Sequence, residues 1–215
     1  MKITGAIFDF DGTLFDSMHV WVGIRDKFFD RIGLHLSPEE EECFKGLYLR
    51  ESLLLAKEKG LVKQSYEELF NSFFDYIKEL YLADTAPKND ITDFLKELEA
   101  RGVKMGIATA TGEPAVKAAL EKFGMLRFFS EICSTYTVGA AKTESKVYDT
   151  VLDSLGTDKA TTWVFEDALY AAKTAKANGY NVVGIYDKSE PDAELLRELV
   201  DIYIHDYKEL GLDEG

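Results

Sequence analysis

The chain has 215 residues, of which 46% are hydrophobic and 13% aromatic, so it can bury one large core or a core domain with a smaller second domain. Its formal net charge of -14 excludes nucleic acid and anionic membrane as favourable partners, because an acidic surface repels both. No stretch approaches the ~20 apolar residues of a membrane span, and the apolar run at the start is too short for a signal peptide. We therefore expect a soluble, cytoplasmic protein.

Apolar runs of strand length alternate with helical patterns along most of the chain. The predicted strands are Ile3–Phe8, Val103–Ala108, Glu131–Ser134, Thr161–Phe165, Val182–Ile185 and Ile202–Ile204. The predicted helices between them are Asn89–Glu99, Pro114–Phe123, Ser145–Leu155, Leu169–Asn178 and Ala193–Leu199. This alternation predicts an α/β fold with a Rossmann-like, mainly parallel sheet and helices on both faces.

One segment, residues 17–85, breaks the alternation because it contains no convincing strand pattern. Its helical patterns are His19–Ile32, Pro38–Phe44, Glu51–Lys59 and Tyr66–Tyr81. A segment of this length is too long for a simple crossover between two parallel strands. We therefore predict an inserted helical cap domain at 17–85 and a core domain formed by residues 1–16 and 86–215.

The first strand ends in the sequence Asp9-Phe-Asp11-Gly-Thr-Leu, which places two carboxylates where open α/β sheets bind their ligands. A carboxylate there can attack a phosphorus centre and form an aspartyl-phosphate. Two carboxyl groups can also hold Mg²⁺, a hard cation that prefers oxygen ligands. The structural alternative is that Asp11 only forms an Asp-Gly turn.

Hydroxyl groups and a lysine follow further along the chain. Thr109 and Thr111 come at the end of the second predicted strand, where hydroxyls and backbone N–H groups can cradle phosphate oxygens. Lys142 comes just before a predicted helix and can neutralise the charge of a phosphate and several carboxylates. Lys146, one helical turn later, is a rival for this role.

A second acid pair, Glu166-Asp167, ends the fourth predicted strand. Carboxylates gathered at one edge of a sheet repel each other unless a cation binds them. Asp167 could alternatively cap the helix that begins near Leu169. The order of acid pair, hydroxyl, lysine and acid pair on strand ends nevertheless indicates one site.

These motifs make the chain resemble the haloacid dehalogenase-like hydrolase superfamily, most of all the branch that holds β-phosphoglucomutase and phosphoglycolate phosphatase. The resemblance covers the whole core, and the helical insert resembles the small cap of that family. It implies that Asp9 is the nucleophile and that Asp11 is the general acid and then the general base. It also implies that Thr109 and Lys142 hold the oxygens of the transferring phosphoryl group.

The same resemblance implies a Mg²⁺ ion bound by Asp9, the backbone carbonyl of Asp11 and Asp167, with Glu166 in support. The chain departs from the family at the Gly-Lys-Pro-x-Pro-Asp element, which reads Ala-Lys142-Thr-Glu-Ser-Lys here. This change keeps the lysine and alters its loop.

Asp11 favours phosphoester chemistry, because dehalogenases of the superfamily lack an acid at that position. Lys45 and Arg50 resemble part of the cap of β-phosphoglucomutase, and we expect them to reach an anion of the substrate. That mutase also uses a cap histidine, whose place is taken here by Trp21. An indole cannot transfer protons near neutral pH. We therefore expect Trp21 either to pack in the core of the cap or to form a wall that contacts the leaving group of the substrate.

We therefore predict a Mg²⁺-dependent phosphatase that hydrolyses a small phosphorylated metabolite. The first alternative is a sugar phosphomutase, which the missing histidine disfavours. The second is a non-catalytic binding module, which the retained acids and lysine disfavour. The third is a dehalogenase, which Asp11 disfavours.

Overall fold

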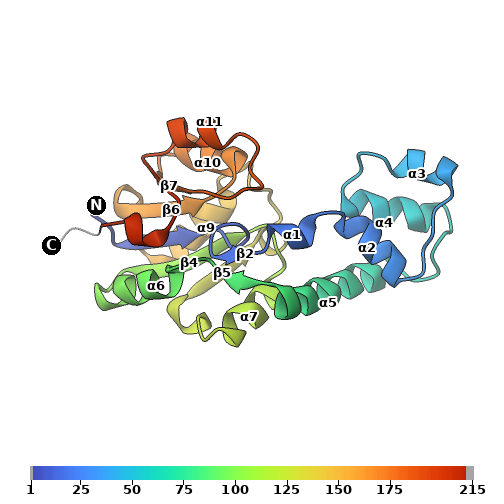
Figure 1. Cartoon of the computed structure of the whole chain (residues 1–215), viewed down its shortest axis with the longest axis horizontal. Helices are drawn as coiled ribbons and strands as arrows, with labels where there is room; N and C mark the ends of the chain where they lie inside the picture. The colour runs from blue at the N-terminus through green and yellow to red at the C-terminus, as the bar shows by residue number, and fades with distance from the viewer. Residues whose placement is uncertain (1, 212–215) are drawn as a thin grey trace.

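A six-stranded sheet forms the centre of the computed structural model, which describes residues 2–211 (Figure 1). Its strand order is β5-β4-β1-β6-β7-β8, and every neighbouring pair in it is parallel. The strands are β1 (Gly5–Phe8), β4 (Lys104–Thr109), β5 (Glu131–Ser134), β6 (Thr162–Glu166), β7 (Asn181–Ile185) and β8 (Ile202–Ile204). This confirms the predicted α/β fold with a parallel Rossmann-like sheet.

Helices cover both faces of this sheet. They are α6 (Ile91–Ala100), α7 (Glu113–Lys122), α8 (Thr135–Val138), α9 (Lys146–Leu155), α10 (Leu169–Ala177) and α11 (Ala193–Leu199). Alternate residues of β1 face opposite sides. Phe8 packs on Phe94 of α6, with ring centroids 6.5 Å apart, whereas Ile7 belongs to the apolar cluster of α9 and α10. Both sides of β1 are therefore dry, which explains its continuous apolar run.

Five further helices extend from the carboxyl end of the sheet (Figure 1). They are α1 (Met18–Trp21), α2 (Ile24–Arg31), α3 (Pro38–Phe44), α4 (Leu49–Glu58) and α5 (Tyr66–Asp84). The prediction of one helix at His19–Ile32 is wrong, because Val22 and Gly23 interrupt the helix and divide it into α1 and α2. Gly23 adopts a left-handed conformation (φ 65°), which ends the first helix and redirects the second.

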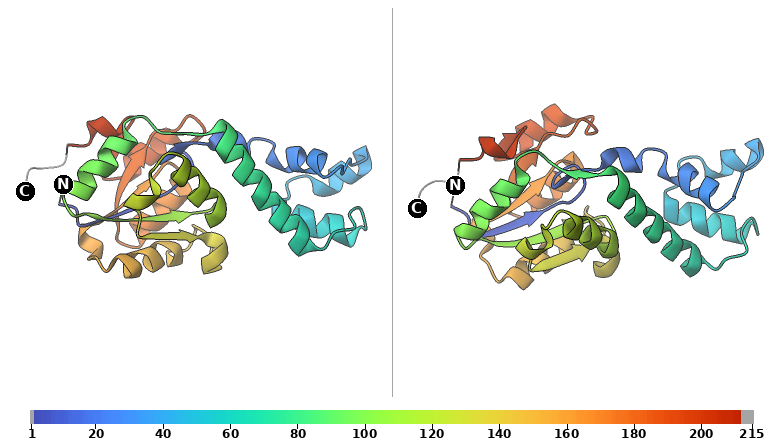
Figure 2. Two further views of the ribbon diagram at one scale, coloured as in Figure 1. Left: turned by 90° about the horizontal axis from the view of Figure 1, so that it is seen from below. Right: turned by 60° about the horizontal axis from the view of Figure 1, so that its bottom comes forward.

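The two connections to this extension pair with each other. Strand β2 (Phe15–Asp16) lies antiparallel to β3 (Ala86–Pro87), and together they form a two-stranded ribbon. Helix α5 continues along the core, where it packs against α7 (Figure 2). The Lys122 ammonium donates to the carbonyl of Leu82, 2.7 Å away. The last turns of α5 are thus held against the core.

Aromatic side chains form the interior of the helical extension. Phe73 of α5 meets Phe28 of α2 edge-to-face, with ring centroids 5.3 Å apart, and both rings are buried. These rings therefore form part of the apolar core of the extension. No helix within residues 2–211 has the length and apolarity that crossing a bilayer requires.

Candidate active site

The motif residues meet at the carboxyl end of three adjacent strands. Because β1 lies between β4 and β6, the residues that follow these strands face one another across a short distance. A cavity of about 280 Å³ opens there. Its lining residues are Asp9, Asp11, Met18, Trp21, Ala110, Thr111, Tyr136, Lys142, Asp167, Ala168 and Tyr170.

Lys142 lies between two carboxylates at the base of this cavity. Its ammonium is 2.5 Å from Oδ1 of Asp9 and 2.7 Å from Oε1 of Glu166, and all three side chains are buried. Burial raises the pKa of Asp9 to about 7, although Lys142 acts in the opposite direction. Burial alone would lower the pKa of Lys142, but Asp9 and Glu166 raise it above its ordinary value. The lysine is therefore a fixed positive charge beside Asp9.

Three acids at this point carry more negative charge than Lys142 offsets. Carboxylate oxygens of Asp9, Glu166 and Asp167 all lie within 4.8 Å of one another. Burial, with the charges of Asp9 and Glu166, raises the pKa of Asp167 well above its ordinary value. The second oxygen of Glu166 is buried and has no hydrogen-bond partner. A hard divalent cation such as Mg²⁺ fits this donor set, because it takes oxygen ligands and supplies the missing charge.

Gly12 and Thr13 determine where the carboxylate of Asp167 lies. Gly12 has φ +77°, and a Cβ atom added to it would lie 2.1 Å from Oδ2 of Asp167. The Thr13 hydroxyl donates to Oδ1 of the same carboxylate at 3.1 Å. The turn after β1 therefore brings its backbone against the second acid pair, which only a residue without a side chain allows.

Asp11 is held by hydroxyl groups rather than by a cation. The Ser17 hydroxyl donates to its Oδ1 at 2.6 Å, and the Thr111 hydroxyl donates to its Oδ2 at 2.5 Å. The buried Tyr81 hydroxyl also donates to Oδ1. The environments of the two aspartates therefore differ, with Asp9 beside Lys142 and Asp11 among neutral donors.

Thr109, the last residue of β4, and Thr111, just after it, occupy different positions. Thr109 is fully buried, and its hydroxyl oxygen accepts a hydrogen bond from the backbone N–H of Thr111 at 3.0 Å. Thr111 itself lines the cavity and contacts Asp11. The geometry thus places the Thr111 hydroxyl on the cavity wall and the Thr109 hydroxyl behind it.

The three predicted site residues of the helical extension lie at different distances from the acids. Trp21 lines the cavity, and its indole N–H is buried without a hydrogen-bond partner at normal distance. Arg50 lines a neighbouring cavity of about 490 Å³, which shares Tyr136 with the first. Lys45 lies on the surface, where its ammonium is 3.3 Å from Oε1 of Glu42. The structure therefore places Trp21 in the cavity with the acids and Arg50 in the neighbouring cavity. Lys45 lies on the surface and lines neither cavity.

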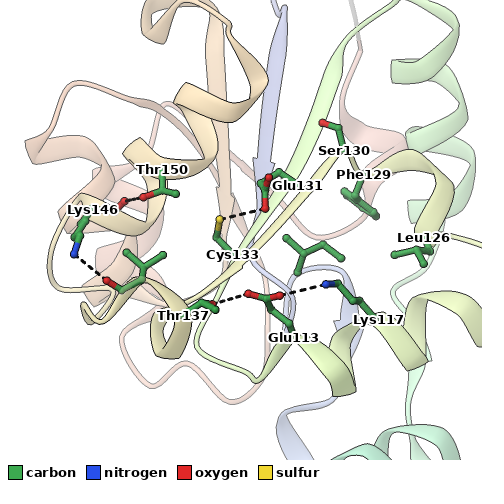
Figure 3. A pocket seen from close by; sticks show the side chains of 12 residues that line it. Glu113, Lys117, Leu126, Phe129, Ser130, Glu131, Cys133, Thr137, Lys146 and Thr150 are labelled. Atoms are coloured by element: carbon green, nitrogen blue, oxygen red, sulfur yellow. Dashed lines mark hydrogen bonds and ion pairs between the residues drawn. The ribbon is translucent and has the colours of Figure 1, made fainter.

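A third cavity, of about 510 Å³, lies along the edge strand β5 (Figure 3). It contains the rival lysine, Lys146, whose ammonium donates to the carbonyl of Val138 at 2.9 Å. Glu113, at its centre, accepts from Thr137 at 2.5 Å and from Lys117 at 3.2 Å (Figure 3). Lys146 thus contacts a backbone carbonyl in this cavity, whereas Lys142 contacts Asp9 and Glu166, so Lys142 is the lysine that the fold places at the acid cluster.

Sequence reasoning missed several polar groups of the site. Tyr148 of α9 donates to Oε1 of Glu166 at 2.7 Å, and Tyr81 of α5 contacts Asp11. Both tyrosines occur within amphipathic helical patterns, where a tyrosine is usually part of the apolar face. Only the packing of these helices against the strand ends shows that their hydroxyls belong to the site.

The sequence matches the family described as haloacid dehalogenase-like hydrolase over residues 6–185. A putative pyrophosphatase, PpaX, of Caldanaerobacter subterraneus subsp. tengcongensis is 24% identical, and the match covers 100% of this chain and 98% of that protein. The validoxylamine A 7'-phosphate phosphatase of Streptomyces hygroscopicus subsp. limoneus is 26% identical over 95% of this chain and 94% of its own length. The crystal structure of CbbY from Rhodobacter sphaeroides in complex with phosphate has a TM-score of 0.77 at 21% identity, covering 97% of this chain and 96% of that chain.

The parallel sheet, its helical extension and the acid-lined cavity define the protein as an α/β enzyme. The chain belongs to the haloacid dehalogenase-like hydrolase family, which confirms the resemblance found in the sequence. Its relatives include phosphatases, and this supports a hydrolase that acts on phosphate esters. The family and the buried acid cluster together suggest a divalent metal ion.

Proposed function

We propose that the chain is a Mg²⁺-dependent phosphatase that hydrolyses a small phosphorylated metabolite through an aspartyl-phosphate on Asp9. The observation that supports this most is the contact of Asp9 with Lys142, beside two further buried acids. This arrangement presents a carboxylate oxygen next to a fixed cation that can bind phosphoryl oxygens.

In the first step, a carboxylate oxygen of Asp9 attacks phosphorus, and the bond from phosphorus to the ester oxygen breaks. Protonated Asp11 gives its proton to the leaving oxygen, so the alcohol departs neutral. In the second step, Asp11 takes a proton from a water molecule that attacks the same phosphorus. The bond to Asp9 then breaks, which releases inorganic phosphate and restores both carboxyl groups.

The remaining groups hold charge in place during these steps. Lys142 neutralises the phosphoryl oxygens, and Thr111 lines the same cavity. Asp9, Glu166 and Asp167 would hold Mg²⁺, which supplies positive charge next to the phosphoryl group when bound. Because phosphoryl transfer depends mostly on positioned cations and an acid for the leaving oxygen, these parts suffice for the reaction.

The rest of the cavity favours a substrate whose leaving group carries no charge. Beyond the acids, Thr111 and Lys142, its wall consists of Met18, Trp21, Ala110, Tyr136, Ala168 and Tyr170. Among the described residues that line it, Lys142 is the cation, and Asp9 and Glu166 already contact it. Aromatic rings and the unpartnered indole N–H of Trp21 suit a hydroxylated or ring-containing alcohol. A phosphorylated sugar or polyol therefore fits better than pyrophosphate.

Phosphate release from a panel of small phosphoesters tests this proposal. The panel includes sugar phosphates, glycerol phosphate, phosphoglycolate and pyrophosphate, each with Mg²⁺ and with EDTA. Asp9→Asn should abolish release, whereas Asp93→Asn, a change to an exposed acid on α6, should leave it unchanged. Release that survives both EDTA and Asp9→Asn would contradict the proposed chemistry. Conversion of glucose 1-phosphate to glucose 6-phosphate without release would favour the mutase instead.

A further inference from the structure

Tyr81 is a residue of the helical extension that contacts an acid of the core. It belongs to the last turns of α5, the long helix of the extension. Its side chain is nevertheless fully buried, and it lies beside Asp11 of the core. Its hydroxyl donates to Oδ1 of Asp11 and lies 3.2 Å from the hydroxyl of Thr111. One phenol thus contacts both Asp11 and a hydroxyl that binds the other oxygen of the same carboxylate.

The position of this phenol is rigidly determined. Its ring stacks on Phe10, with centroids 5.6 Å apart, and Phe10 lies directly between the two aspartates of the first motif. The backbone carbonyl of Tyr81 accepts from the Thr85 hydroxyl at 2.9 Å, at the end of the helix. A stacked ring has few alternative rotamers, so the hydroxyl stays where α5 places it.

The donors around Asp11 come from different parts of the chain. Thr111 follows β4 of the core, and Ser17 lies at the start of the extension. Tyr81 comes from the end of the extension, some seventy residues after Asp11. The orientation of the Asp11 carboxylate therefore depends on where α5 lies against the core.

We propose that Tyr81 is a positioning residue, whose hydroxyl holds the Asp11 carboxyl group in the orientation needed to protonate the leaving oxygen. This inference rests on the proposed role of Asp11. Removing the hydroxyl leaves the ring and its packing in place, but it removes one of the donors that direct the carboxyl group. The loss should therefore appear in proton transfer and not in substrate binding.

Leaving-group dependence separates this role from a structural one. An alkyl phosphate needs a proton on its departing oxygen, whereas p-nitrophenyl phosphate releases a stable anion and needs little acid help. The ratio kcat/KM reports the steps up to departure of the leaving group. For Tyr81→Phe we expect kcat/KM to fall about 10- to 100-fold with a sugar phosphate and less than about 3-fold with p-nitrophenyl phosphate. We expect KM to stay within about 2-fold of the unaltered protein.

Tyr180→Phe is the matched control. The Tyr180 ring is also buried, and its hydroxyl donates to Oδ1 of Asp149 at 2.7 Å, on the far side of the sheet from Tyr81. This change removes a similar hydrogen bond without touching Asp11, so it should leave the ratio between the two substrates unchanged. Thermal melts of both variants would show that each is folded.

Asp11→Asn distinguishes failure of this inference from failure of the proposed function. It should show the same preference for p-nitrophenyl phosphate, and adding Tyr81→Phe to it should cause no further loss. If Asp11→Asn discriminates between the substrates but Tyr81→Phe lowers both equally or neither, the role of Tyr81 is overturned alone. If Asp11→Asn itself affects both substrates equally, the acid role of Asp11 is overturned and the inference about Tyr81 with it.

Discussion

The close approach of Gly12 to Asp167 predicts that one added methyl group will weaken metal binding. In Gly12→Ala, the new Cβ would lie 2.1 Å from Oδ2 and 2.6 Å from Cγ of Asp167. An ordinary contact begins at 3.4 Å, so the carboxylate must move by about 1 Å. Because this carboxylate belongs to the acid cluster, we expect Mg²⁺ affinity to fall about 10- to 100-fold and activity to fall about 100-fold.

The same substitution also carries a backbone cost that has to be measured separately. Gly12 has φ +77°, and placing a Cβ in that left-handed region costs about 1–2 kcal/mol. Gly102→Ala is the control, because Gly102 has φ +71° and no heavy atom within 4 Å of the added Cβ. Both variants should therefore lose about 3–6 °C in Tm, and only Gly12→Ala should lose Mg²⁺ affinity.

Two measurements compare Mg²⁺ binding by Gly12→Ala and Gly102→Ala. The increase in Tm on adding Mg²⁺ reports binding to the folded protein, and phosphate release as a function of Mg²⁺ concentration reports the active complex. If Gly12→Ala and Gly102→Ala show the same Mg²⁺ response as the unaltered protein, the reasoning that Gly12 positions Asp167 is refuted. If both lose activity to the same extent, the effect comes from backbone strain alone.

Two other substitutions follow from the buried ion pairs. Lys142→Met should lower kcat/KM for phosphate release at least about 100-fold, because it removes the cation beside Asp9, while Lys146→Met should change it less than about 3-fold; equal losses would contradict the assignment of Lys142. Asp187→Asn breaks the ion pair between the buried Asp187 and the partly buried Lys88 (2.6 Å) and should destabilise the protein by about 1–3 kcal/mol at pH 7 in urea unfolding. Burial alone would raise the pKa of Asp187, but Lys88 and Ser189 bring it below its ordinary value of 3.8, so the contribution is present at neutral pH and is lost as the pH falls below about 4. A difference between Asp187→Asn and the unaltered protein that stays constant from pH 7 to pH 3 would contradict this.

Much of the core could be predicted because the signals are local. The strands and helices after residue 86 follow from hydrophobic period and from glycines at helix ends, and the structure has them within about two residues. The acid pairs could be assigned to one site because the carboxyl ends of parallel strands share one edge. The break at Gly23 was missed, since a glycine within an apolar helical pattern can either be tolerated or end the helix.

The sequence by itself determined the parallel sheet, the inserted helical segment and the acids and lysine that gather at the strand ends. Only the tertiary structure decided that Tyr81 and Tyr148 contribute hydroxyls to this site, because each is brought there by a helix that packs from another part of the chain. It also decided that Thr111 rather than Thr109 lines the cavity. The two threonines are alike in sequence, and only the course of the backbone after β4 determines which hydroxyl faces the cavity. Spacing along the chain describes local geometry, whereas contacts across the fold depend on how whole elements pack against each other.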